Sequence, residues 1–191
     1  MSRWEPDARG RLERAALELY RERGFEQTTV AEIAKRAGLT ERTFFRYFAD
    51  KREVLFAGAG QLQDFLVSAL ASTPESAAPI DAIAAALQAA AAVLQERGEY
   101  AGQRQAVIAS HAELRERELI KLASLAAALA ATLRQRGVAE PAASLAAEAG
   151  IAVFRIAFER WASQPSQPSQ AGLAQLIRES LDELKAVTAG K

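Results

Sequence analysis

The sequence contains no cysteine and only one histidine among its 191 residues. The missing thiols exclude disulfides and cysteine-ligated zinc or iron–sulfur sites. A single histidine argues against a His-ligated metal centre and against a Ser-His dyad. The sequence also offers no phosphate-cradling glycine loop, so we expect no metal, no cofactor and no enzymatic activity. Absence of cysteine fits a reducing compartment, and we expect a cytoplasmic location.

Long hydrophobic runs are missing as well. The longest uncharged apolar stretch, residues 82–95, is rich in alanine, holds two glutamines and is too short to span a bilayer. The amino terminus opens with charged residues and lacks the apolar core of a secretory signal. We therefore expect a soluble chain with no membrane partner.

Neither sign of charge is in excess, because 24 basic side chains face 24 acidic ones. Residues 1–55 carry 12 basic and 10 acidic side chains, whereas residues 56–191 carry 12 and 14. Alanine divides the chain more clearly, with 7 in the first part and 37 in the second. Five of the eight phenylalanines lie between Phe25 and Phe56. We predict two domains, 1–55 and 56–191, with the boundary inside a shared helix near residues 50–70.

Helix-forming residues dominate throughout, which predicts an all-α fold of about nine helices. The first is expected over residues 8–23, with Gly24 at its end. Asp50 and Glu53 are expected to form a capping box that starts a long fourth helix. Further breaks are expected at 72–79, at 97–98, at Ser110 (a capping box with Glu113), at 137–141, and at the polar connector 164–170.

Residues 29–48 read TVAEIAKRAGLTERTFFRYF and show the spacing of a helix-turn-helix. Thr29 and Glu32 form a capping box, Gly38 occupies the turn, and Thr40 caps the third helix. In that helix Phe44 and Phe48 lie four residues apart and can be buried together. The neighbouring faces carry donors suited to a DNA groove, namely Arg42, Thr43, Arg46 and Tyr47.

Lys51 and Arg52 are expected in the first turn of the fourth helix, where the macrodipole disfavours cations. A bound phosphate would relieve this conflict, since helix amides and a lysine together attract anions. Asp50 and Glu53 could instead offset the same charge within the chain.

The segment 9–56 resembles the N-terminal domain of the TetR family of transcriptional regulators. The resemblance rests on an Ala-Leu-rich first helix followed by Arg-Gly-Phe, Thr-Thr-Val, Ala-Gly-Leu-Thr, Phe-Arg-Tyr-Phe and Asp-Lys. It implies a three-helix DNA-binding domain followed by a larger helical domain for ligand binding and dimerisation. Residues 57–191 match by length, helicity and order only. The segment 104–136 is also similar to actinobacterial TetR-type regulators, some of which bind acyl thioesters.

The resemblance makes residues 41–48 the recognition helix. It implies that Arg42, Thr43 and Phe45 face base edges, with Arg42 reading guanine and Phe45 limited to apolar contact. It further implies that Tyr47 and Lys51 contact phosphates. The predicted DNA-binding residues are Thr29, Thr40, Glu41, Arg42, Thr43, Phe45, Arg46, Tyr47 and Lys51. The alternatives are that both threonines act only as caps and that Tyr47 is a half-buried ring.

The remaining helices supply two stripes, each a row of apolar or small side chains along one side of a helix. They also supply a separate set of mainly apolar side chains that could line a pocket. The stripes are predicted to pair two chains as a homodimer, and they comprise Ala146, Gly150, Val153, Ala157, Trp161, Leu173, Leu176, Ile177, Leu181 and Leu184. The alternative is that both stripes pack within one chain. The predicted ligand pocket comprises Phe65, Leu66, Leu87, Tyr100, Arg104, Leu114, Phe154 and Phe158. Tyr100 and Arg104 would also look ordinary on a surface.

Taken together, these features predict a homodimeric transcriptional regulator, specifically a repressor that binds a palindromic operator in double-stranded DNA. A small apolar or amphipathic effector, with an acyl thioester among the candidates, would release it by shifting the fourth helix and the spacing of the two recognition helices. The alternative is a helical adaptor that uses the helix-turn-helix to dock a protein.

Overall fold

The computed structural model describes residues 7–163 and 172–190, and the predicted connector at 164–170 lies outside them. The described residues form nine α-helices, one short 3-10 helix and no strand, which confirms the predicted all-α class. The elements are α1 (Ala8–Arg23), α2 (Val30–Arg36), α3 (Glu41–Tyr47), η1 (Glu53–Phe56), α4 (Ala59–Ala71), α5 (Pro79–Gln95), α6 (Gly98–Ala109), α7 (Ala112–Gln135), α8 (Ala142–Ala162) and α9 (Leu173–Thr188).

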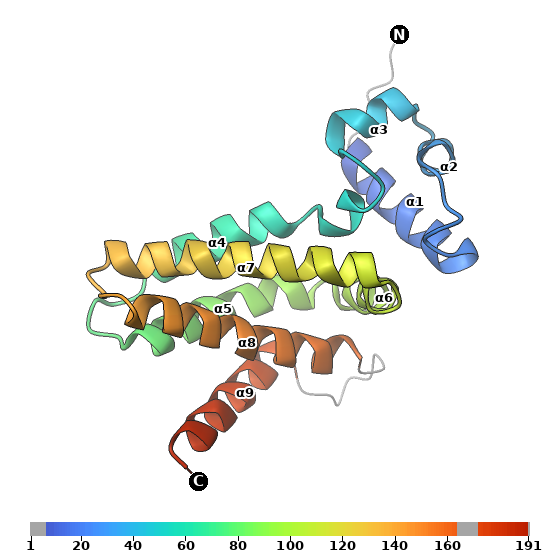
Figure 1. Cartoon of the computed structure of the whole chain (residues 1–191). Helices are drawn as coiled ribbons and strands as arrows, with labels where there is room; N and C mark the ends of the chain where they lie inside the picture. The colour runs from blue at the N-terminus through green and yellow to red at the C-terminus, as the bar shows by residue number, and fades with distance from the viewer. Residues whose placement is uncertain (1–6, 164–171, 191) are drawn as a thin grey trace.

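Helices α1, α2 and α3 form a compact group at one end of the molecule (Figure 1). The predicted end of the first helix and the predicted turn are confirmed, because Gly24 ends α1 at φ 88° and Gly38 turns the chain at φ 67°. Thr29 and Glu32 make the expected capping box of α2. The core of this group is built from α1, α2 and α3 together with η1, and it also takes in Val107, Ile108 and Leu114 of α6 and α7.

The other helices form a bundle in which α5 packs against α4, α8 and α9, while α7 lies beside α4 and α8 (Figure 1). Alanine is abundant at the crossings, and its small side chain lets helix axes approach closely. Helices α5 and α8 pack tightly at Gly150, because a Cβ added there would overlap Cγ2 of Ile83.

The predicted long fourth helix is wrong. Asp50 accepts bonds from the backbone amides of Arg52 (2.8 Å) and Glu53 (3.1 Å), as a capping residue would. Glu53, however, turns its carboxylate to Arg117 and Lys121 of α7 instead of returning it to Asp50. Only half of the capping box forms, the chain takes a 3-10 turn, and α4 begins at Ala59. No shared helix joins the two predicted domains.

The capping box predicted at Ser110 is also wrong, because the Ser110 hydroxyl bonds to the Val107 carbonyl (2.9 Å) and His111 precedes α7 without a side-chain cap.

Among the described residues, the segment 53–71 is the one stretch long and apolar enough to cross a bilayer. It is divided between η1 and α4, and α4 packs against α5 and α7. Part of it lines an internal cavity. Its buried residues, Val54, Leu55, Phe56, Leu66 and Leu70, belong to the two cores.

Candidate nucleic-acid interface and internal cavity

Helix α3 has one buried face and one exposed face. Phe44 is completely buried and Phe48 nearly so, with ring centroids 5.5 Å apart. On the other side Phe45 is 56% exposed and Tyr47 is 40% exposed. The aromatic pair at i and i+4 thus anchors the helix, and the intervening residues project outward.

The exposed face of α3 carries two arginines that no acidic side chain of the described chain neutralises. Arg42 and Arg46 are both exposed and take part in no ion pair among residues 7–163 and 172–190. Arg46 lies over the Tyr47 ring at 4.9 Å and donates to the Tyr47 hydroxyl at 3.0 Å. By contrast, Arg36 of α2 is paired with Glu18 and Glu22 of α1. Positive charge is therefore available on α3 in particular.

The two predicted threonines serve as caps. The Thr29 hydroxyl accepts from the Glu32 amide (3.2 Å), and the Thr40 hydroxyl accepts from the Thr43 amide (3.2 Å). Hydrogen bonds from the backbone and hydroxyl of Thr29 hold the pKa of Glu32 below its ordinary value. Both threonines and Glu41 are exposed, so capping leaves the two threonines accessible.

Lys51 is more deeply engaged than the sequence indicates. Its ammonium donates to the carbonyls of Phe25 (2.8 Å), Glu26 (3.1 Å) and Thr28 (3.1 Å), and it lies 4.5 Å from the centre of the Phe25 ring. A lysine has three N–H donors, and all three are used. Lys51 therefore braces the connection between α1 and α2, and the electrostatic conflict predicted at this position is resolved inside the chain.

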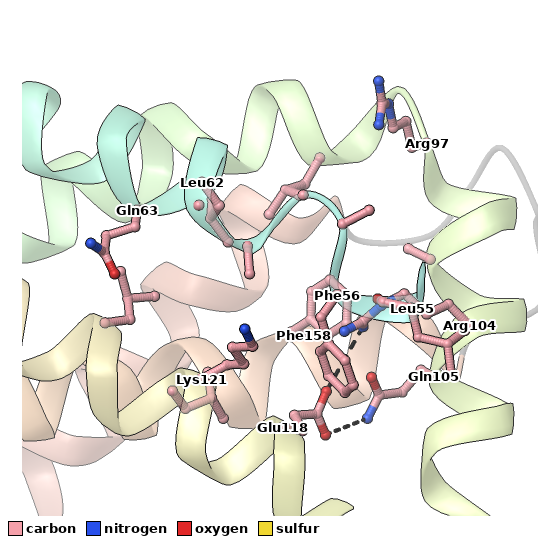
Figure 2. Close-up of a pocket in the computed structure, with 18 of the residues that line it drawn as sticks. Leu55, Phe56, Leu62, Gln63, Arg97, Arg104, Gln105, Glu118, Lys121 and Phe158 are labelled. Atoms are coloured by element: carbon pink, nitrogen blue, oxygen red, sulfur yellow. Dashed lines mark hydrogen bonds and ion pairs between the residues drawn. The ribbon is translucent and has the colours of Figure 1, made fainter. Parts of the chain in front are cut away.

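An internal cavity of about 380 Å³ opens where η1 and the start of α4 meet α6, α7 and α8 (Figure 2). Its walls are mainly apolar and include Leu55, Phe56, Leu62, Leu122 and Phe158. This volume falls within the range of small-molecule sites.

Four of the eight predicted pocket residues line this cavity, namely Tyr100, Arg104, Phe154 and Phe158. The other four do not. Leu66, Leu87 and Leu114 are fully buried in the two cores, and Phe65 lies on the outer side of α4 with 40% of its surface exposed. These four predictions fail because successive residues of an α-helix point in directions about 100° apart, so a neighbour of a pocket-lining residue can face the core or the solvent.

Sequence reasoning missed the polar wall that α7 contributes. Glu118, Lys121, Leu122 and Leu125 line the cavity at a helical spacing of three and four residues. That spacing is visible in the sequence, but it mixes charged and apolar side chains and does not stand out as an apolar stripe.

Arg104 is the most constrained charge in the cavity wall. Its Nε donates to the Leu55 carbonyl, its Nη1 lies 3.8 Å from Glu118 Oε1, and its guanidinium lies 5.2 Å from the centre of the Phe56 ring. Burial lowers the pKa of Arg104. Gln105 donates to Glu118 at 3.4 Å (Figure 2). Arg104 therefore joins the cavity wall to η1, directly after the helix-turn-helix.

The residues predicted to pair two chains are mostly core of one chain. Gly150, Val153, Ala157, Leu173, Leu176, Ile177 and Leu181 are buried, and Ala146, Trp161 and Leu184 are partly buried against the same cluster. The seven buried residues are therefore occupied within one chain, and the pairing role of the three partly buried ones stays a prediction. The physical reason is that α8 and α9 turn their most apolar faces toward α5 and toward each other.

The helix-turn-helix segment is similar in sequence to known proteins. Residues 13–57 match the family described as "Bacterial regulatory proteins, tetR family". The HTH-type transcriptional regulator TcmR of Streptomyces glaucescens is 38% identical over 81 residues, which are 42% of this chain and 36% of TcmR. The match thus spans about a third of that relative's length.

Among the solved structures that resemble this chain, two cover nine tenths of it or more. The TetR family regulator PfmR of Thermus thermophilus is 25% identical with a TM-score of 0.51, over 90% of this chain and 94% of PfmR. The regulator FadR of Bacillus subtilis, solved in complex with stearoyl-CoA, is 22% identical with a TM-score of 0.63, over 92% of this chain and 96% of FadR. Residues 13–57 thus carry the N-terminal segment of the TetR family of bacterial regulatory proteins, and the all-α architecture of the chain is similar to that of the two solved regulators.

Proposed function

We propose that the protein is a transcriptional regulator that acts in the cytoplasm and inserts α3 into the major groove of DNA. The observation that carries the proposal is the exposed face of α3, where Arg42 and Arg46 have no acidic partner in the described chain and Phe45 and Tyr47 stand clear of the core. A short helix with donors on its outer face suits a groove that admits an α-helix and offers acceptors on guanine.

The α3 residues have separate roles in this proposal. Arg42 reads a guanine through O6 and N7, and Phe45 makes apolar contact with a thymine methyl. Arg46 and Tyr47 are already joined to each other and contact phosphates as a unit. Thr29, Thr40, Glu41 and Thr43 border this surface. Residues 1–55 carry the DNA-binding function and residues 56–191 the sensing and pairing functions.

Replacing Arg42 with alanine is expected to weaken operator binding by about 1–3 kcal/mol and to relax specificity at one base pair of each half-site. The measurement is a mobility shift on DNA from upstream of the protein's own gene, with each half-site base varied in turn. Arg178→Ala on α9 is the matched control, since it removes the same charge from an exposed position outside the helix-turn-helix. Equal, sequence-independent binding to every fragment would rule out the proposed function.

Replacing Lys51 with methionine is expected to lower thermal stability, because three backbone carbonyls lose their donor. The slope of log affinity against log salt should stay unchanged, since the bound ammonium is not a phosphate contact in this arrangement. A slope reduced by about one would show that Lys51 does neutralise a phosphate.

We further propose that the regulator is a homodimer on a palindromic operator. A stripe on the outer face of α8 supports this, because Leu145 and Ile156 are 66% and 45% exposed and half-buried Ala149 and Ala152 lie between them. These residues follow a spacing of four, three and four, which places them on one side of the helix. On α9, Val187 is also 66% exposed. This stripe replaces the buried one predicted from the sequence.

The cavity supports regulation by a small apolar or amphipathic effector, with an acyl thioester among the candidates. Its walls are chiefly apolar, and they include η1, which follows the helix-turn-helix. We propose that the protein represses transcription and that effector binding releases it from DNA by changing the spacing of the two recognition helices.

A further inference from the structure

The cavity holds more positive than negative side chains. Arg97, Arg104, Lys121 and Arg155 line it, against Glu13, Glu118 and Glu159. Each carboxylate is paired with an arginine, since Glu13 contacts Arg9, Glu118 contacts Arg104 and Glu159 contacts Arg155. These pairs use all three carboxylates of the wall together with Arg104 and Arg155, so that Arg97 and Lys121 are the described lining cations without an ion pair to another lining residue.

Lys121 differs from the other cations because its partner comes from outside the cavity lining. Its ammonium lies 3.3 Å from Oε2 of Glu53, the first residue of η1. Arg117, one helical turn earlier on α7, also pairs with Glu53 but does not line the cavity. Of the two partners of Glu53, a ligand in the cavity could therefore contact Lys121 but not Arg117. Figure 2 shows the Lys121 side chain extending toward the cavity.

We propose that the cavity binds an amphipathic anion whose head group pairs with Lys121 in place of Glu53. The proposal rests on the proposed function and names the ligand class of the same cavity. The apolar tail would lie between η1, α7 and α8, against Leu62, Leu122 and Phe158. Exchange of one carboxylate for another keeps the ammonium paired, so it avoids leaving a partly buried charge alone.

The exchange also acts on the DNA-binding end of the molecule. Two cations of the cavity wall hold η1, Lys121 through the Glu53 carboxylate and Arg104 through the Leu55 carbonyl. Loss of the Lys121 contact leaves Glu53 attached to α7 by Arg117 alone. Because η1 follows α3 after a short turn, a loosened η1 frees the orientation of the helix-turn-helix.

Calorimetric titration of the full chain with three twelve-carbon probes tests the proposal. Dodecanoate, 1-dodecanol and dodecylammonium have the same tail and differ in head-group charge. Dodecanoate should bind the wild-type protein at least tenfold more tightly than either of the others. Equal or tighter binding of dodecanol or dodecylammonium, or no binding of dodecanoate, would overturn the proposal.

Three variants locate the head group. Lys121→Gln should lose at least tenfold in dodecanoate affinity, whereas Arg117→Gln, which removes the other Glu53 partner, should stay within threefold of wild type. Glu53→Gln should bind dodecanoate more tightly, because the competing carboxylate is gone. Thermal melts establish that each variant is folded. Equal losses in Lys121→Gln and Arg117→Gln would show that the head group does not lie at Lys121.

Failure of this inference can be told apart from failure of the proposed function. The titrations need no DNA, whereas the function is tested by operator binding without ligand. If the operator binds, dodecanoate should weaken binding by wild type about tenfold and have little effect on Glu53→Gln, in which the ion pair is already lost. Binding of dodecanoate without any operator binding would leave the ligand site standing and remove the regulator.

Discussion

Replacing Phe44 with alanine is expected to destabilise the helix-turn-helix by about 3–5 kcal/mol, because a completely buried ring leaves a cavity. The ring packs against Phe48 and meets the Phe45 ring edge-on at 5.4 Å. A loss of this size is comparable with the whole stability of a small domain. Operator binding should therefore fall below detection, although Phe44 itself does not face the DNA.

The adjacent residue provides the control for this prediction. Phe45→Ala removes the same side chain from an exposed position and should leave the melting temperature within about 2 °C of wild type, since exposed substitutions cost little. Its effect should appear only in affinity for operators that carry thymine at the contacted position. The measurements are thermal melts followed by circular dichroism, together with mobility shifts. A stable Phe44→Ala protein that still binds its operator would contradict the assignment of the α3 faces.

The second large effect is expected at the crossing of α5 and α8. Replacing Gly150 with valine should destabilise the bundle by about 2–3 kcal/mol, because even a Cβ at this position would overlap Cγ2 of Ile83. Gly150 and Ile83 are both buried, so neither the introduced valine side chain nor that of Ile83 can move outward. For a chain of this length we expect the melting temperature to fall by roughly 5–10 °C.

A compensating substitution identifies the cause of that loss. Ile83→Ala alone should be destabilising, but the double variant should be more stable than the two single losses predict, by about 1 kcal/mol or more. The shift caused by Gly150→Val should also be independent of protein concentration, because the overlap lies within one chain. If the change in melting temperature instead depended on protein concentration, Gly150 would lie at an interface between chains.

The helix-turn-helix was largely predictable because its signals are local. A threonine three residues before a glutamate, a glycine in a turn and two phenylalanines four residues apart each act over one helical turn. Thr29, Gly38 and Phe44 therefore stand where the sequence predicts. The exposure of Arg42 and Arg46 also follows from helix periodicity, because the buried Phe44 and Phe48 fix which side of the helix faces outward.

The start of the fourth helix shows where local signals fail. Asp50 and Glu53 carry the spacing of a capping box, but the box is only half formed because Arg117 and Lys121, more than 60 residues away, attract the Glu53 carboxylate. Lys51 is similar, because its three carbonyl partners come from another part of the chain. A charged side chain has several partners within reach, and the sequence does not rank them.

The sequence by itself determined the helical class, the helix-turn-helix and the face that α3 presents, because these depend on propensity, capping and periodicity within a few residues. Tertiary structure alone decided the partners that one helix finds in another. It placed the stripes of α8 and α9 in the core of one chain, left Leu145 and Ile156 outside, and put Lys121 between Glu53 and the cavity. The physical reason is that an apolar stripe specifies burial but not the surface that buries it, and that an ion pair depends on distances set only when the helices pack.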